Sequence, residues 1–221
     1  MSVNKEAYYN LKSKVDASKA LLVAVSKTKP NEDIEALYSI GHRDFGENYV
    51  QELIKKNQEL PSDIRWHFIG HLQSNKIKQI APFVYLIHGV DSFKLLDVID
   101  KEGRKLGKKI NCLLQVHIAK EETKFGLDIN ETREAATHYF IENKYAYINL
   151  CGLMGMASFT EDKKLVQQEF SGLKSLFDEI KEMKGADTSS FNTLSMGMSG
   201  DFQLAIEEGS TMVRIGSSLF S

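Results

Sequence analysis

The sequence predicts an α/β protein whose 221 residues form a single (β/α)8 TIM barrel domain, residues 1–221. Short apolar runs alternate with helical patterns from one end of the chain to the other, as α/β folds require. Eight such runs occur, which is the strand number of this barrel. Runs such as NCLLQV (111–116) are apolar on both faces, which is typical of a parallel sheet covered by helices. A doubly wound open sheet is the alternative that this pattern leaves open.

The predicted strands are short apolar segments spaced along the whole chain. Only three prolines occur and no low-complexity run interrupts the alternation, so the sequence indicates no linker or domain boundary. The strands are expected at residues 21–26, 42–47, 65–70, 84–90, 110–118, 148–156, 192–197 and 211–216.

Helical patterns fill the longer intervals between these runs. Residues 31–41 carry apolar side chains on one face and end at Gly41, a typical C-cap. Residues 91–107 begin with an Asp-Ser pair suited to N-capping. Residues 131–144 and 162–185 continue the alternation.

Composition excludes several classes of protein. The net charge of -2 gives no electrostatic reason to expect a nucleic-acid or membrane partner. No apolar run is long enough to span a bilayer, and the polar N-terminal segment lacks a signal-peptide core. Cys112 and Cys151 both lie in apolar segments and are expected to be buried thiols. We therefore expect a cytoplasmic protein.

The ends of the last two strands suggest a phosphate site. In a (β/α)8 barrel the active site lies at the carboxyl ends of the strands, and phosphate is often bound after strands seven and eight. Gly and Ser residues gather there in SMGMSGD (195–201) and RIGSS (214–218). A short helix starting near Asp201 or Phe202 is expected to point backbone N–H groups at an anion. The alternative is that these segments are ordinary turns.

A lysine and an arginine complete this candidate site. Lys27 continues the period-2 phase of the first strand, whereas Lys29 directly precedes Pro30, so we expect Lys27 to be the more buried of the two. Arg214 lies within an apolar strand and needs a partner, either a core carboxylate or a ligand. An amine, a phosphate cradle and an arginine together suit pyridoxal 5'-phosphate (PLP), with the lysine binding the aldehyde.

The same segments resemble the pyridoxal phosphate homeostasis proteins, relatives of the N-terminal barrel of alanine racemase. The matching stretches are AVSKTKP (24–30), FGENYVQE (45–52), WHFIGHLQSNK (66–76), TKFGL (123–127), GLM (152–154) and LSMGMSGDFQLAIEEGSTMVRIGSSLF (194–220). They extend from the first predicted strand to the last. The resemblance implies the (β/α)8 barrel rather than the open sheet.

The resemblance also implies roles for individual residues. Lys27 matches the lysine that forms the internal aldimine with PLP, and Asn48 matches an asparagine near the cofactor. Ser199, Gly216 and Ser217 match phosphate-holding positions, with Met198 contributing backbone. Arg214 matches the arginine that faces the pyridine nitrogen.

The function implied by the resemblance is control of PLP supply, with no established catalysis. Racemases of this fold take a second base, a tyrosine, from an additional β-domain, for which this chain has no room. We therefore expect a PLP-binding carrier or regulator and not an enzyme, with PLP-dependent enzymes as recipients of the cofactor. The alternative is a weak amino-acid racemase. A monomer is the default expectation.

Three further polar residues near these strand ends have no assigned role. His67 and His71 lie four residues apart, but on a strand and its exit and without a carboxylate motif, so we predict no metal site. Glu47 either orients Asn48 or faces solvent, and the sequence does not separate these two possibilities.

Overall fold

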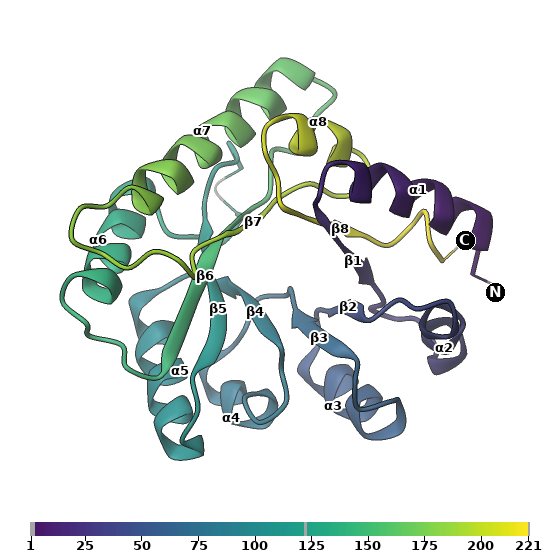
Figure 1. The fold of residues 1–221 in the computed structure, drawn as a ribbon, viewed down its shortest axis with the longest axis horizontal. Helices are drawn as coiled ribbons and strands as arrows, with labels where there is room; N and C mark the ends of the chain where they lie inside the picture. Colours follow the sequence, from purple (N-terminus) through teal and green to yellow (C-terminus); the bar gives the residue numbers. More distant parts are fainter. Residues whose placement is uncertain (1–2, 122, 221) are drawn as a thin grey trace.

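A computed structural model describes residues 3–121 and 123–220, in which eight parallel strands form a closed barrel (Figure 1). The strands are hydrogen-bonded in chain order, and β8 pairs with β1 to close the ring. This closure confirms the predicted barrel and excludes the open sheet. The strands are β1 (Leu21–Val25), β2 (Asp44–Glu47), β3 (Arg65–Phe68), β4 (Leu86–Val90), β5 (Ile110–Val116), β6 (Ile148–Gly155), β7 (Thr193–Ser195) and β8 (Met212–Ile215).

The helices form an outer ring around this barrel, as Figure 1 shows. In that ring, α1 lies between α8 and α2. The helices are α1 (Lys5–Ala17), α2 (Asn31–Ser39), α3 (Val50–Glu59), α4 (Ile77–Ile80), α5 (Phe93–Leu106), α6 (Ile129–Phe140), α7 (Lys163–Lys181) and α8 (Phe202–Glu207), with the short 3-10 helix η1 (Ser74–Lys76) leading into α4. Within the described ranges, no helix combines the length and the apolarity needed to cross a membrane.

The sequence patterns located all eight strands and five of the helices. Helix α8 begins at Phe202, as expected, and α2, α5 and α7 lie within the predicted helical segments, whereas α6 begins two residues before the predicted segment 131–144. Helix α3 was not predicted because one of its two buried side chains is Lys56, which weakens the apolar stripe. Cys112 is buried as expected, whereas Cys151 is only partly buried.

Two apolar layers stabilise the barrel. The larger lies between strands and helices and includes Leu22, Phe45 and Trp66. The smaller fills the barrel interior and consists of Val23, Leu86, Leu113, Met154 and Met212. In β1, β5 and β8, neighbouring residues of the strand enter different layers, as the period of a strand requires.

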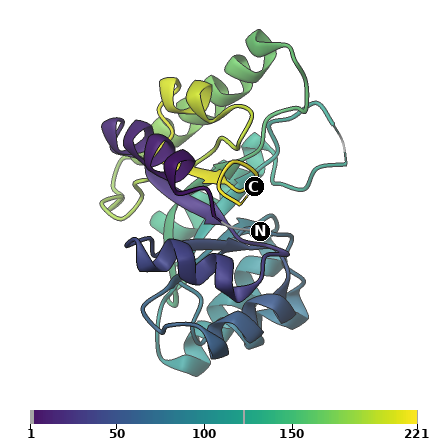
Figure 2. The same ribbon diagram turned by 90° about the vertical axis from the view of Figure 1, so that its right-hand side faces the viewer.

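The two ends of the described chain lie side by side (Figures 1 and 2). Leu21 pairs with Met212 and Ala24 with Ile215 across the β1–β8 seam. The backbone N–H of Asn4 also donates to the carbonyl oxygen of Leu219 at 3.3 Å. Residues from the beginning and the end of the chain therefore meet at one edge of the barrel mouth.

Candidate functional site

Lys27 lies in the turn that follows β1 at the barrel mouth, and its side chain is exposed. Lys29 is only partly exposed, because its amine donates to the Phe220 carbonyl oxygen at 3.0 Å. The expectation that Lys27 is the more buried lysine is therefore wrong: β1 ends at Val25, and the turn carries Lys27 out to the mouth. Within the described ranges the Lys27 amine has no hydrogen bond or ion pair, so it is available to a ligand.

Asn48 follows β2 next to the Lys27 turn. The register pairs Val25 with Gly46, and Lys27 and Asn48 each lie two residues beyond that pair. The Asn48 Oδ1 atom is buried and has no hydrogen-bond partner among the residues described. Gly70 packs directly on the Asn48 backbone, since a Cβ at that glycine would lie 2.4 Å from the Asn48 carbonyl oxygen. The protein thus fixes the backbone of Asn48 while its side-chain oxygen remains without a partner.

The loops after β7 and β8 carry free backbone donors. In the described chain, the N–H groups of Ser199, Gly200, Ser217 and Ser218 have no hydrogen-bond partner. The Met198 N–H differs from expectation, because it donates to Asp201 Oδ1 at 2.6 Å and is not free. Free amides beside serine hydroxyls form a donor set that fits a phosphate group.

Gly216 joins the second of these loops to β8. It lies beside the end of β1, where a Cβ at this position would be 3.0 Å from the Val25 carbonyl oxygen. This close approach places the start of the β8 loop against the strand that carries Lys27. Ser217, the next residue, is exposed at the mouth.

Arg214 is a buried cation inside the barrel, with only 4% of its surface exposed. Its guanidinium donates to Ser195 Oγ at 2.6 Å and to the Gly155 carbonyl oxygen at 3.0 Å. No carboxylate among the described residues forms an ion pair with it, so the core-carboxylate explanation is excluded there. Burial lowers the pKa of Arg214 to about 10, against a smaller opposing effect of Asp201. Arg214 therefore keeps its charge at neutral pH and can only donate hydrogen bonds.

A chain of buried hydrogen bonds runs from Arg214 away from the mouth. Ser195 Oγ lies 3.1 Å from His88 Nδ1, His88 Nε2 lies 3.0 Å from His67 Nδ1, and His67 Nε2 lies 3.1 Å from Asp44 Oδ1. Burial lowers the pKa of both histidines, so both rings are neutral.

These contacts determine the tautomers. Because the Asp44 carboxylate only accepts, His67 carries its proton on Nε2 and accepts at Nδ1. His88 must then donate from Nε2, which leaves its Nδ1 to accept the Ser195 hydroxyl proton. Each group in the chain from Arg214 to Asp44 thus donates a hydrogen bond to the next group. This order fixes the orientation of the Ser195 hydroxyl, which accepts from the Arg214 guanidinium.

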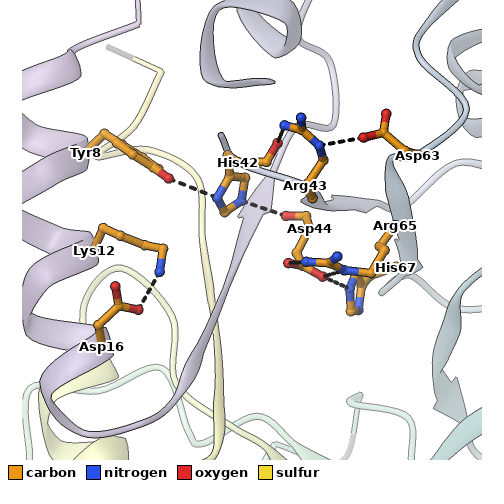
Figure 3. Close-up of polar contacts among 9 residues, drawn as sticks. All are labelled: Tyr8, Lys12, Asp16, His42, Arg43, Asp44, Asp63, Arg65 and His67. Atoms are coloured by element: carbon orange, nitrogen blue, oxygen red, sulfur yellow. Dashed lines mark hydrogen bonds and ion pairs between the residues drawn. The ribbon is translucent and has the colours of Figure 1, made fainter. Parts of the chain in front are cut away.

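Asp44, the first residue of β2, terminates this chain, and Figure 3 shows its contacts with His42, Arg65 and His67. It accepts hydrogen bonds from Arg65 and His67, and its backbone oxygen accepts from His42 at 2.9 Å. Burial alone raises the pKa of Asp44, but the hydrogen bonds from Arg65 and His67 outweigh it and lower this pKa to about 2. Asp44 is consequently ionised at neutral pH and anchors the network.

Glu47 is fully buried and neither faces solvent nor bonds to Asn48. Its Oε1 accepts from the Ser26 hydroxyl and, at 2.8 Å, from the amine of Lys56. Burial raises the pKa of Glu47, against the opposing effect of the Lys56 cation. Glu47 therefore neither orients Asn48 nor faces solvent, the two possibilities that the sequence left open. It forms a buried ion pair with Lys56 beneath the Lys27 turn.

His67 and His71 have separate environments despite their spacing. His67 is buried in the interior network, whereas the His71 ring lies over the mouth and stacks on Phe125 at a centroid distance of 3.9 Å. The Lys124 amine donates to the Ala157 carbonyl oxygen at 2.6 Å, which ties the loop after β5 to the loop after β6.

The sequence analysis missed the residues that support Lys27 and Arg214. His88 carried a signal, since it is a polar side chain in the otherwise apolar strand β4, whereas Ser195 shares its face of β7 with the polar Thr193 and carried none. Lys56 carried a weaker one: it lies four residues after Glu52, a spacing that favours an ion pair on a helix. Neither signal specifies which residue the side chain contacts.

Comparisons with known proteins all match the same family. The family model of the alanine racemase N-terminal domain matches residues 5–221. The pyridoxal phosphate homeostasis protein of Pasteurella multocida is 40% identical over 202 residues, which cover 90% of this chain and 84% of that protein. The human protein of the same name is 40% identical over 209 residues, covering 90% of this chain and 75% of that protein.

Comparison with solved structures leads to the same family. PipY of Synechococcus elongatus, solved with PLP bound, is 34% identical, with a TM-score of 0.86 over 98% of this chain and 99% of that one. An alanine racemase of Clostridium difficile shares the fold, with a TM-score of 0.76, 17% identity, and 99% of this chain but 56% of that one covered. The barrel, the residues at its mouth and these matches together show that the chain belongs to the pyridoxal phosphate homeostasis protein family, within the alanine racemase N-terminal domain fold.

Proposed function

We propose that this chain binds PLP at the barrel mouth, holds it covalently through Lys27, and serves PLP homeostasis in the cytoplasm without substantial catalysis. The observation that carries the proposal is Arg214, a buried guanidinium without a carboxylate partner among the described residues. Burying such a charge is costly unless a ligand acceptor compensates it. The printed names of the relatives and the PLP-bound PipY structure support the same ligand.

The donor set at the mouth fits each part of this cofactor. PLP supplies an aldehyde that condenses with a lysine amine with loss of one water, a phosphate, and a ring nitrogen that accepts a hydrogen bond. Lys27 provides the amine. Ser199, Gly216 and Ser217 hold the phosphate, and Met198 shapes the loop that presents the free N–H groups.

Arg214 and Asn48 complete the pocket. Arg214 stays protonated and donates toward the ring nitrogen, so it does not deliver a proton there. Asn48 uses its unpartnered Oδ1 to accept a hydrogen bond from the 3-hydroxyl group of PLP. An arginine in this place disfavours a protonated ring, which makes the pocket poorly suited to stabilising a carbanion.

A weak amino-acid racemase is the second candidate, favoured by the family model. Against it, the chain covers 56% of the Clostridium difficile racemase, and the rest of that enzyme lies outside the match. A racemase needs a second acid–base group on the opposite face of its substrate. A direct assay of D- and L-amino-acid interconversion by the PLP-loaded chain separates the two, and we expect no turnover above that of free PLP.

The proposed attachment is tested by borohydride reduction of the PLP-loaded chain, followed by peptide mass spectrometry. We expect the reduced cofactor on Lys27, and loss of both the attachment and the bound-PLP absorbance band in Lys27→Ala. Lys29→Ala is the matched control from the same loop, and it should retain both signals because its amine is bonded to Phe220. Attachment at another lysine, or an unchanged band in Lys27→Ala, contradicts the assignment.

A further inference from the structure

The turn that carries Lys27 has a backbone conformation that needs external support. The Lys29 N–H donates to the Ser26 carbonyl oxygen at 3.0 Å, which closes the turn. Within it, Thr28 has φ of 63°, a left-handed backbone conformation that is unfavourable for a β-branched residue. The Lys27 side chain is exposed and unbonded, so it cannot itself hold the turn in place.

A cluster of the buried Lys56 and Glu47 and the partly exposed Glu52 supplies this support. The Lys56 amine donates to the Ser26 carbonyl oxygen at 2.8 Å, to Glu47 Oε1 at 2.8 Å and to Glu52 Oε1 at 2.6 Å. An ammonium group has three N–H donors, so all of them are used.

The two glutamates then bind the residues on either side of Lys27. Glu47 accepts the hydroxyl proton of Ser26, and Glu52 accepts the backbone N–H of Thr28 at 2.7 Å. The residue before Lys27 and the residue after it are therefore held by a single cluster, which spans β2 and α3.

We propose that Lys56 is a positioning residue that, through Glu47 and Glu52, presents the Lys27 amine to PLP. This inference rests on the proposed function. A purely structural role for the cluster is the competing explanation. A buried ion pair is a weak source of stability, and an apolar side chain at position 56 fills similar space. What only the cluster provides is the set of hydrogen bonds to Ser26 and Thr28.

The test compares two ligands that differ only at the reacting group. PLP carries the aldehyde, whereas pyridoxine 5'-phosphate carries an alcohol there and reports phosphate and ring contacts alone. By equilibrium dialysis we expect Lys56→Met to lower the affinity for PLP by about tenfold or more, and to change the affinity for pyridoxine 5'-phosphate by less than about twofold. Borohydride reduction should trap a smaller fraction of PLP on Lys27.

Lys12→Met is the control, because it removes a lysine from another i,i+4 ion pair, on α1, and should leave both affinities unchanged. Equal loss of both ligands in Lys56→Met would show general damage and overturn the inference. Wild-type affinity for PLP and wild-type attachment in Lys56→Met would also overturn the inference, but the proposed function would then stand. Absence of PLP on Lys27 in the wild-type chain overturns both.

A second variant covers the case in which Lys56→Met does not fold. Glu52→Ala releases the Thr28 N–H but leaves the buried Lys56–Glu47 pair intact, and the Glu52 side chain is 23% exposed. We expect weaker PLP binding and less attachment than in the wild type, again with unchanged affinity for pyridoxine 5'-phosphate. Wild-type PLP binding in Glu52→Ala contradicts the inference.

Discussion

Asn48 and Lys29 illustrate two kinds of polar residue at the barrel mouth. The Lys29 amine is bonded to the Phe220 carbonyl oxygen, so its hydrogen bond serves the protein itself. Asn48 Oδ1 is buried without a hydrogen-bond partner in the described chain, and such an unpaired polar atom destabilises the folded protein. Under the proposed function, a hydrogen bond donated by bound PLP compensates this loss of stability.

We therefore expect Asn48→Ala to weaken PLP binding without weakening the fold. The affinity should fall by about tenfold, which corresponds to the loss of one hydrogen bond. The free energy of unfolding of the ligand-free chain should change by less than about 0.5 kcal/mol. Cofactor titration and urea unfolding measure the two effects.

Asn111→Ala is the contrasting control. The Asn111 side chain donates to the Tyr85 carbonyl oxygen at 3.0 Å and accepts from Asn149 at 2.8 Å. Its removal should lower stability and leave PLP affinity unchanged. If Asn48→Ala instead behaves like Asn111→Ala, Asn48 is a structural residue.

Local pattern made Lys27 and Arg214 candidates for the site, since strand phase and an apolar setting single them out, and their roles toward PLP stay predictions. The exposure of Lys27 depends on where β1 ends and on the turn after it, which the phase does not give. Lys56 was missed because a lysine within a helix is usually solvated, and only the folded chain brings Ser26 and Glu47 to it.

Among the elements, β6 depends most on a single glycine. Gly152 has φ of 153° and lies where the register between β5 and β6 shifts. A Cβ at this position would lie 1.7 Å from the Thr193 carbonyl oxygen on β7. Gly172, in the middle of α7, has no atom within 4 Å of such a Cβ.

This contrast predicts opposite effects for the same substitution. Gly152→Ala should destabilise the chain by about 3 kcal/mol or more, because the methyl group forces β6 and β7 apart. Gly172→Ala should stabilise it by about 0.5–1 kcal/mol through the better helix propensity of alanine. Urea unfolding of both variants measures the difference, and a tolerated Gly152→Ala contradicts the close approach.

At this scale the strands were easier to predict than the helices. Most strands are apolar runs, so their positions follow from composition within a few residues, although β2 (DFGE) and β3 (RWHF) carry charged residues. Helix α1 has only Tyr8, Leu11 and Val15 buried among many charged residues, and α4 is only four residues long. Their helical periodicity is too weak or too short to stand out.

For the whole molecule, three buried histidines connect stability to pH. His42, His67 and His88 are at most 3% exposed, and burial is the main cause that lowers the pKa of each. For His42 the pKa falls from 6.5 to about 4. Between these values the unfolded chain binds a proton that the folded chain does not, so stability present above pH 6.5 is lost as the pH falls.

We expect the free energy of unfolding to decrease steadily from pH 7 to pH 4, with His42 accounting for about 3 kcal/mol. Urea unfolding at a series of pH values measures this slope. His42→Gln should be less stable at pH 7, since it lacks the imidazole contacts with Tyr8 and Asp44, but its slope should be shallower. An unchanged slope in His42→Gln contradicts the assignment.

The seam between β1 and β8 has a consequence for synthesis on the ribosome. Lys27 emerges early, whereas Arg214, Gly216 and Ser217 belong to the last strand and the loop after it, which pair with β1 only when the ring closes. A growing chain therefore exposes the reactive amine long before it possesses the proposed phosphate and ring-nitrogen contacts. Under the proposed function, PLP capture waits until β8 has been synthesised and has paired with β1, and a chain interrupted before that point has an exposed lysine with no pocket around it.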